Sequence, residues 1–190
     1  QLHYLRMKAI GPFAGTEEID FGRLGTTGLF LLEGATGAGK STIIDAICFA
    51  LYNSVAQKRA DAERIHSHHA DPQTTPEVEL VFETQMGIYK VLRTPRFERP
   101  KLRGAGSTVA QPSVKVWRFG TVEAALDPRS EGELLSRSLG EAEDEITRAI
   151  GLKKDQFVQT VVLPQGEFAS FLKASSDEKG QLLEKVFGTH

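Results

Sequence analysis

The sequence predicts an α/β fold with a mixed sheet around one central helix and an additional antiparallel β section. Residues 28–33 form a continuous apolar run after a glycine, which is typical of a strand buried on both faces. Apolar residues then recur at helical spacing over residues 41–51. Apolar and polar residues alternate over residues 77–83 and 113–119, which indicates half-buried strands.

The first half of the chain contains a hairpin, the central strand and helix, and a polar connection. Residues 2–10 alternate as a strand, and residues 18–21 form a second short strand after a Gly-Pro turn. The helix that begins near Ser41 is expected to span about 12 residues. Residues 58–76 are polar and contain several histidines and prolines, so we expect a loop or an irregular crossover.

The second half begins with another hairpin and ends in helices. Residues 77–83 and 88–92 pair through a turn at a glycine. Residues 95–112 are rich in Gly, Pro and Arg, so we expect an exposed loop before the strand over residues 113–119. Helical periodicity then predicts three helices: one over residues 141–150, one capped by Asp155, and one over residues 176–188.

The composition limits the class of protein. With 190 residues and 40% apolar content, residues 1–190 are expected to form a single domain. A formal net charge of -2 gives no support for DNA binding over the whole surface, so a local basic patch would be needed. The single cysteine, Cys48, excludes an intramolecular disulfide and favours a reducing compartment. No apolar run is long enough to cross a membrane, and we expect a cytoplasmic protein with no membrane partner.

A phosphate-binding loop is the strongest functional motif. Gly34, Gly39, Lys40 and Ser41 fit the spacing G-x-x-x-x-G-K-S between the expected buried strand and helix, the context that distinguishes this loop from a chance glycine-rich turn. Glycines let successive N–H groups face phosphate oxygens, and the helix N-terminus adds its positive end. Lys40 is expected to contact the β- and γ-phosphates, and the Ser41 hydroxyl to bind Mg²⁺. The predicted ATP-binding residues are Gly34, Ala35, Thr36, Gly37, Ala38, Gly39, Lys40, Ser41 and Thr42.

The motifs for ATP hydrolysis are incomplete. P-loop enzymes usually carry an acidic residue at the end of a second buried strand, where it binds magnesium or activates water. No run of four apolar residues in this chain ends in Asp-Glu, and residues 135–140 resemble the Leu-Ser-Gly-Gly signature of ABC-type ATPases only superficially. The sequence therefore predicts a chain that binds ATP but lacks the groups to hydrolyse it alone.

Several further segments resemble the SbcC family, the bacterial counterparts of the Rad-fifty double-strand-break repair ATPases in the SMC-like branch of ABC ATPases. The resemblance covers nearly the whole chain and implies a P-loop NTPase of the ABC/SMC head type, as its N-terminal lobe. Its most specific part is the run Leu-Pro-Gln-Gly-Glu-Phe at residues 163–168. The other matching segments are residues 11–15, 19–21, 34–41, 44–47, 69–72, 161–162, 171–172 and 182–189.

This resemblance implies further site residues and partners. Gln165 corresponds to the family's Q-loop glutamine, which ligates Mg²⁺ and orients water, so Lys40 and Gln165 become the predicted catalytic residues. The coiled coil, the zinc hook and the C-terminal lobe with the missing acid are expected to lie outside this chain. The implied partners are that lobe, a second head bound in an ATP-dependent homodimer, an SbcD-like nuclease and double-stranded DNA in the nucleoid.

Two positions near the nucleotide depend on the resemblance alone. Members from archaea and eukaryotes carry a basic residue close to the position of Gly11 and Pro12, and this chain has none there. By position, His66 resembles a residue of the segment that borders the nucleoside in the family.

A basic stretch is the candidate DNA contact. Six cations lie within 14 residues at positions 90–103, and they fit either phosphate-backbone contacts or a solvated hairpin. The candidate residues are Arg93, Arg96, Arg99, Lys101 and Arg103. The implied function is ATP-driven head closure and hydrolysis that gate an SbcD exo/endonuclease on DNA ends. A structural SMC-like tether that binds ATP without useful turnover, and a small-molecule P-loop kinase, are the alternatives.

Overall fold

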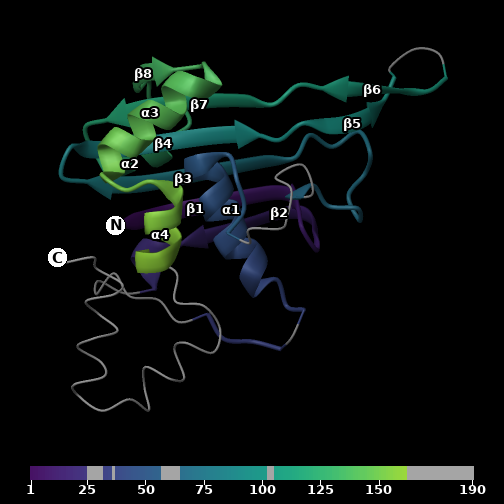
Figure 1. Ribbon diagram of the computed structural model, residues 1–190, viewed down its shortest axis with the longest axis horizontal. Helices are drawn as coiled ribbons and strands as arrows, with labels where there is room; N and C mark the ends of the chain where they lie inside the picture. The colour runs from purple at the N-terminus through teal and green to yellow at the C-terminus, as the bar shows by residue number, and fades with distance from the viewer. Residues whose placement is uncertain (25–31, 36, 57–64, 102–104, 162–190) are drawn as a thin grey trace. The chain divides into compact units, whose positions relative to one another are not determined.

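The structure is a computed structural model in which the chain divides into two units, Gln1–Gly151 and Leu152–His190. Each unit is described by itself. The first unit carries the sheet and most of the helices, and the second contributes one described helix, α4 (Lys154–Val161) (Figure 1). The described residues are 1–24, 32–35, 37–56, 65–101 and 105–161.

Six strands form one sheet in the order β2-β1-β3-β4-β7-β8, with β2 and β8 at its edges (Figure 1). Every neighbouring pair runs antiparallel, which confirms the predicted antiparallel section. The strands over residues 2–10 and 113–119 are confirmed at their predicted bounds. The six strands are β1 (Leu2–Ile10), β2 (Phe13–Asp20), β3 (Glu77–Thr84), β4 (Gly87–Thr94), β7 (Ser113–Phe119) and β8 (Glu133–Ser136).

Aliphatic side chains from four strands form a row across one face of this sheet. Leu5 pairs with Leu80, Leu80 with Val91, and Val91 with Val116. All four side chains are fully buried. Because side chains alternate between the two faces of a strand, this row defines the inner face, and the helix α1 (Lys40–Tyr52) packs against β1, β3 and β4.

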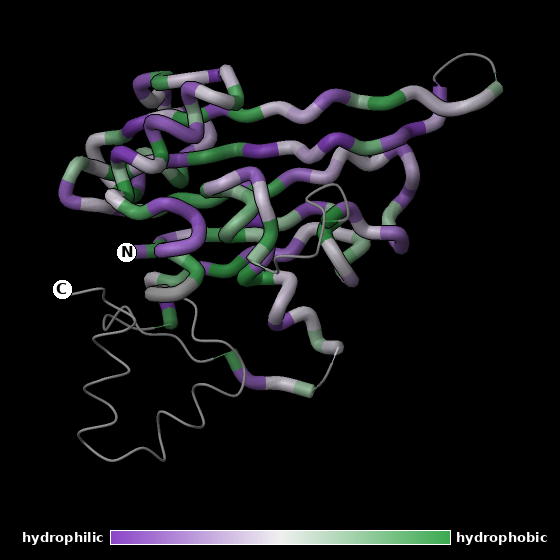
Figure 2. The backbone as a smooth tube through the Cα atoms, viewed as in Figure 1, coloured by the Kyte–Doolittle hydropathy of each residue, from purple (hydrophilic) through white to green (hydrophobic). Residues whose placement is uncertain are grey.

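The opposite face of the sheet carries a smaller apolar cluster. Val81 and Ile88, which alternate with the inner row, pack with Ala125 of the short helix α2 (Val122–Leu126). Figure 2 shows the resulting succession of hydrophobic and hydrophilic residues along the strands. Helices therefore cover parts of both faces, although only the inner face supports the phosphate-binding loop.

The helix α3 (Leu139–Ile150) confirms the helix expected over residues 141–150 and begins two residues earlier. Its buried residues are Ala142, Ile146 and Ala149, as the helical spacing predicted. The sequence did not predict α2 or β8, because each is too short to show a period. The one-turn helix η1 (Phe21–Arg23) follows β2.

Two predictions about strands need correction. The expected exposed loop over residues 95–112 contains the strands β5 (Phe97–Pro100) and β6 (Ser107–Ala110), which pair antiparallel as a two-stranded ribbon beyond the ends of β4 and β7 (Figure 1). Proline hid β5 from the sequence pattern, but a two-stranded ribbon consists of edges that tolerate proline. The short strand expected over residues 18–21 is part of β2, which begins at Phe13.

Some predicted elements fall outside the described residues. The central strand over residues 28–33 lies there except for its last two residues, which have no regular structure, so the mixed sheet around α1 stays a prediction. The helix over residues 176–188 also lies outside. Asp155 stands in the first turn of α4 rather than at its cap, and the Lys153 N–H there donates to Gln156 Oε1 at 2.9 Å. None of the helices in the described part of the chain has the length and apolarity that crossing a bilayer requires.

Arg93 on β4 is buried on the inner face of the sheet, with an exposed fraction of 0%. Its Nε donates to the Ala50 carbonyl in the last turn of α1 at 3.1 Å, and its two terminal nitrogens have no hydrogen-bond partner among the described residues. Burial lowers the pKa of Arg93 to about 10, and the charge of Glu143 opposes this shift. A DNA contact needs an accessible cation, so the assignment of Arg93 to the basic patch is wrong for this structure.

Replacing Arg93 with methionine is expected to keep the stability of the chain or to raise its free energy of unfolding by up to about 3 kcal/mol, because an incompletely paired buried cation is removed at similar volume. Arg93→Ala should be less stable than Arg93→Met by about 2 to 4 kcal/mol, because it leaves a cavity. Urea unfolding at pH 7 measures both differences. A loss of more than about 2 kcal/mol in Arg93→Met would show that the terminal nitrogens do have partners.

Candidate nucleotide-binding site

Two glycines shape the entry into α1. Gly39 occupies the cap position of the helix with a φ of 84°, and Gly37 has a φ of 85°. Both values lie in the left-handed region, which is costly for a residue with a Cβ, so glycine permits the sharp turn at both positions. The Ile43 N–H then donates to the Gly39 carbonyl at 3.2 Å and begins the helical hydrogen bonding.

The first turn of α1 leaves backbone donors for a ligand. Within the described residues no side chain caps the helix, and its first turn contains no acidic residue. The N–H groups of Lys40, Ser41 and Thr42 have no acceptor inside the helix, because the first amides of any α-helix lack one. These donors and the positive end of the helix dipole favour an anion. The exposed residues around them are Gly34, Ala35, Gly37, Ala38 and Ser41.

Lys40 holds its charge within the loop. Its Nζ donates to the Gly34 carbonyl at 2.5 Å and to the Ala35 carbonyl at 2.7 Å. An ammonium group has more donors than these two bonds use, so a phosphate oxygen can bind beside the carbonyls or replace one of them. The structure thus brings a cation and free amides to the same loop, and the residues present fit a polyphosphate.

The turn between β1 and β2 packs directly against this loop. A Cβ on Gly39 would lie 2.4 Å from the Phe13 ring, and a Cβ on Gly11 would lie 2.5 Å from Cγ2 of Thr42. Real Cβ atoms do not approach other atoms so closely, so these contacts require glycine. The sequence pattern did not predict this packing, because a local pattern does not report which distant segment a turn contacts.

His66 lies next to the same turn. It forms an isolated antiparallel bridge with Ile10, and its ring contacts Phe97 edge-on, with ring centroids 5.6 Å apart and planes at 65°. Its Nε2 atom is buried and has no hydrogen-bond partner within the described residues. Burial lowers the pKa of His66, and His68 adds to the shift, so the imidazole is neutral at pH 7. The contribution of His66 to nucleotide binding stays a prediction.

The predicted DNA-contact residues differ in exposure. Arg93 is buried, and Arg103 lies outside the described residues. A hydrogen bond between Ser107 and Glu98 crosses the ribbon and engages the acidic residue nearest to the cations. The exposed cations of the described set are Arg96, Arg99 and Lys101.

The predicted magnesium ligands are described only in part. Ser41 is exposed at the first turn of α1, where its hydroxyl is available to a cation. Gln165 and Thr36 lie outside the described residues. The catalytic and metal-binding roles assigned to Gln165 therefore stay predictions.

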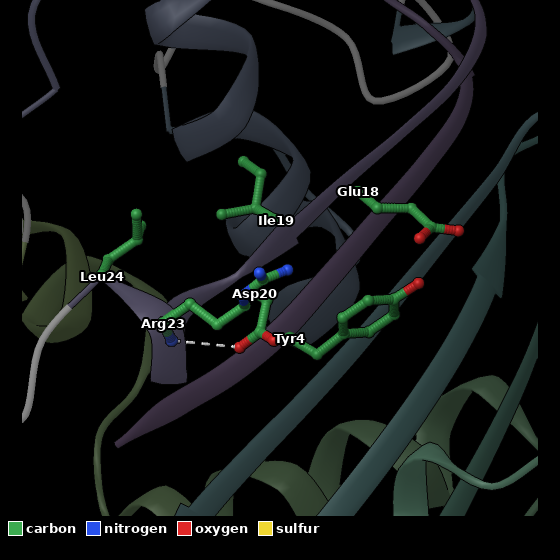
Figure 3. Close-up of a pocket in the computed structure, with 6 residues that line it drawn as sticks. All are labelled: Tyr4, Glu18, Ile19, Asp20, Arg23 and Leu24. Atoms are coloured by element: carbon green, nitrogen blue, oxygen red, sulfur yellow. Dashed lines mark hydrogen bonds between the residues drawn. The ribbon is translucent and has the colours of Figure 1, made fainter.

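A pocket of about 500 Å³ lies along β1, β2 and η1 (Figure 3). The Tyr4 hydroxyl points toward the Glu18 carboxylate, and burial together with Glu18 raises the pKa of Tyr4 to about 12. Asp20 adds a second carboxylate and accepts the Arg23 N–H at 3.3 Å. Two carboxylates repel a phosphate, so this pocket does not fit ATP. The lining residues are Tyr4, Glu18, Ile19, Asp20, Arg23 and Leu24.

Known proteins match this chain over nearly its whole length. A family model described as an AAA domain matches residues 4–188. The SbcC subunit of nuclease SbcCD from Vibrio cholerae serotype O1 is 40% identical over 186 residues, which cover 97% of this chain and 18% of that protein. Proteins of the same name match from Lactococcus lactis subsp. lactis, at 34% identity over 98% of this chain and 17% of the relative, and from Staphylococcus aureus (strain JH9), at 33% over 97% and 17%.

The matches include the phosphate-binding loop and the C-terminal motifs on which the resemblance rested. The chain spans less than a fifth of the length of these curated relatives. The matched region extends from β1 through the glycine-rich loop to residue 188. The chain therefore belongs to the AAA domain family, and its resemblance to the SbcC subunit of nuclease SbcCD is confirmed.

Proposed function

We propose that this chain is the ATP-binding, N-terminal lobe of an SbcC-type ATPase head. The observation that carries the proposal is the uncapped first turn of α1, with the Lys40 ammonium inside the glycine loop. Many protein classes contain a phosphate-binding loop, so the loop alone supports only nucleotide binding. The curated relatives, all named as the SbcC subunit of nuclease SbcCD, narrow the proposal to this type of head.

Backbone donors and one side chain would bind the nucleotide. The free N–H groups at the start of α1 would donate to phosphate oxygens, as the helix dipole favours. Lys40 would direct an N–H donor to the β- and γ-phosphates while Gly34 and Ala35 keep the ammonium near the loop. Hydrogen bonds between an ammonium and a phosphate are stronger than neutral ones, so Lys40 contributes most to distinguishing a triphosphate from a diphosphate.

Hydrolysis would need groups from more than one part of the protein. Bound Mg-ATP supplies the phosphoanhydride bond that is cleaved. Ser41 would ligate Mg²⁺ through its exposed hydroxyl, and Gln165 would ligate the ion and orient water through a neutral amide oxygen. The acid that activates water would come from the C-terminal lobe.

The proposed role in the whole protein is mechanical. Two heads would close around ATP, and hydrolysis would open them again, because ATP binds the closed state more tightly. The name of the relatives describes one component of the nuclease SbcCD, and we extend this arrangement to an SbcD exo/endonuclease gated on DNA ends. A cytoplasmic, nucleoid-associated location follows from this role.

The β5–β6 ribbon is the proposed DNA contact in this lobe. Its exposed cations Arg96, Arg99 and Lys101 lie within six residues of one another, whereas the whole chain has a net charge of -2. Such a local cluster binds phosphates through counterion release, independently of base sequence. This matches a protein that acts on DNA ends rather than on a particular site.

Lys40→Ala in the complete protein is expected to weaken Mg-ATP binding by about 10- to 100-fold and to abolish ATP-dependent head closure, because it removes the charge-assisted bonds to phosphate. Calorimetry measures the affinity, and light scattering with ATP measures the dimer. The matched control is Lys115→Ala, which removes an exposed lysine on β7. Closure at wild-type ATP concentrations in Lys40→Ala would contradict the mechanism.

Changing Arg96, Arg99 and Lys101 to glutamate in the complete complex should weaken binding to double-stranded DNA at low salt. The slope of log affinity against log salt should decrease by about 2 to 3, because up to three phosphate contacts are lost. Lys115, Arg129 and Arg148 changed to glutamate form the control, with the same change in net charge at exposed sites on other elements. Equal DNA affinity in the two triple variants would exclude the ribbon.

The rate of ATP hydrolysis in the wild-type complex separates the proposed machine from a structural tether. The proposal expects DNA to accelerate hydrolysis. A complex that binds ATP and DNA but does not turn over ATP faster with DNA would favour the tether.

A further inference from the structure

The base of the β5–β6 ribbon is packed against the segment that carries His66. Phe97, the first residue of β5, has an exposed fraction of only 6%, and its ring meets the edge of the His66 ring. Arg99 lies two residues further along the strand and so projects from the same face of β5 as Phe97. A phosphate bound at Arg99 therefore acts on the strand whose first residue touches His66.

The segment around His66 is fastened to the end of β1. The Gly11 N–H donates to the Ile65 carbonyl at 2.7 Å, and the Ser67 N–H donates to the Ala9 carbonyl at 2.8 Å. These two bonds flank His66 on both sides. Any displacement of His66 therefore moves the end of β1 and the turn that follows it.

That turn touches the phosphate-binding loop with no space between. The positions of Gly11 against Thr42 and of Phe13 against Gly39 leave no room for even one added carbon atom. Closely packed groups of this kind transmit displacements instead of absorbing them. A continuous series of contacts thus runs from the ribbon through Phe97 and His66 to the start of α1.

We propose that the ring contact between His66 and Phe97 links DNA binding on the β5–β6 ribbon to the nucleotide site, with both residues acting as positioning residues. The inference rests on the proposed function, because it needs a head that binds ATP at the loop and DNA at the ribbon. It assigns His66 a role through the turn at Gly11 rather than through direct contact with the nucleotide.

The shape of the His66 ring, and not its polarity, is what this contact uses. Its Nε2 atom is buried without a partner in the described residues, so removing that nitrogen sacrifices no hydrogen bond. An edge-on pair of rings depends on two flat side chains at the right separation. Phenylalanine at position 66 can keep such a pair, whereas alanine cannot.

The test compares variants of the complete complex by the ratio of ATP hydrolysis with saturating double-stranded DNA to hydrolysis without DNA. We expect His66→Ala and Phe97→Ala to lower this ratio by about 2- to 30-fold, and the double variant to lower it no further than either single one. His66→Phe should keep the wild-type ratio. DNA affinity at low salt should remain within about twofold of wild type in each variant, because the cations are retained.

Two additional variants control for folding and for the ribbon itself. Phe97→Leu keeps an apolar side chain of similar volume but removes the ring, so it should lower the ratio without unfolding the ribbon. Val109→Ala truncates an exposed apolar residue of β6 and should leave the ratio unchanged.

Three outcomes overturn the inference in different ways. A wild-type ratio in both His66→Ala and Phe97→Leu would show that the rings do not couple the sites. A loss in His66→Phe as large as in His66→Ala, with a raised KM for ATP in the absence of DNA, would show that the imidazole nitrogen serves the nucleotide directly. A wild-type complex without ATP turnover or without DNA stimulation is instead a failure of the proposed function.

Discussion

An α-helix that starts without internal acceptors for its first amides has to find partners elsewhere, and at α1 no described side chain supplies them. The glycine at the cap position removes the usual Ser, Thr, Asp or Asn cap and at the same time lets the Phe13 ring lie against the backbone. A helix start of this kind is less favourable by itself and more favourable with a phosphate bound. The geometry of the loop, the position of Lys40 and the packing of the N-terminal turn all follow from this one requirement.

The other end of α1 has the opposite electrostatic need, and Arg93 meets it. The last carbonyls of a helix carry partial negative charge, and the Arg93 Nε donates to one of them. Burial makes the cation costly, as the lowered pKa of Arg93 reflects. Arg93 and the aliphatic row of the inner face thus hold α1 on the sheet, which fixes the orientation in which its first turn faces a ligand.

Local sequence patterns predicted what depends on local structure. The spacing of Gly34, Gly39 and Lys40 identified the loop, and alternation gave β1 and β7 to the residue. Alternation could also have placed Arg93, which is two residues from the buried Val91 and so on the same face, but counting charges along the chain ignored direction. The approach of Phe13 to Gly39 was beyond reach, because these residues are 26 positions apart and nothing in either segment names the other.

The two edges of the sheet differ in how they discourage unwanted pairing with another chain. Within the described residues β2 has only β1 as a neighbour, so one side of its backbone presents unpaired groups. Glu17 and Glu18 are exposed on that strand, and β8 at the other edge is only four residues long. Adjacent carboxylates and a short strand both make strand-to-strand aggregation unfavourable. A protein that associates with a second copy through a nucleotide benefits from such edges, because they keep stacked sheets from competing with the intended assembly.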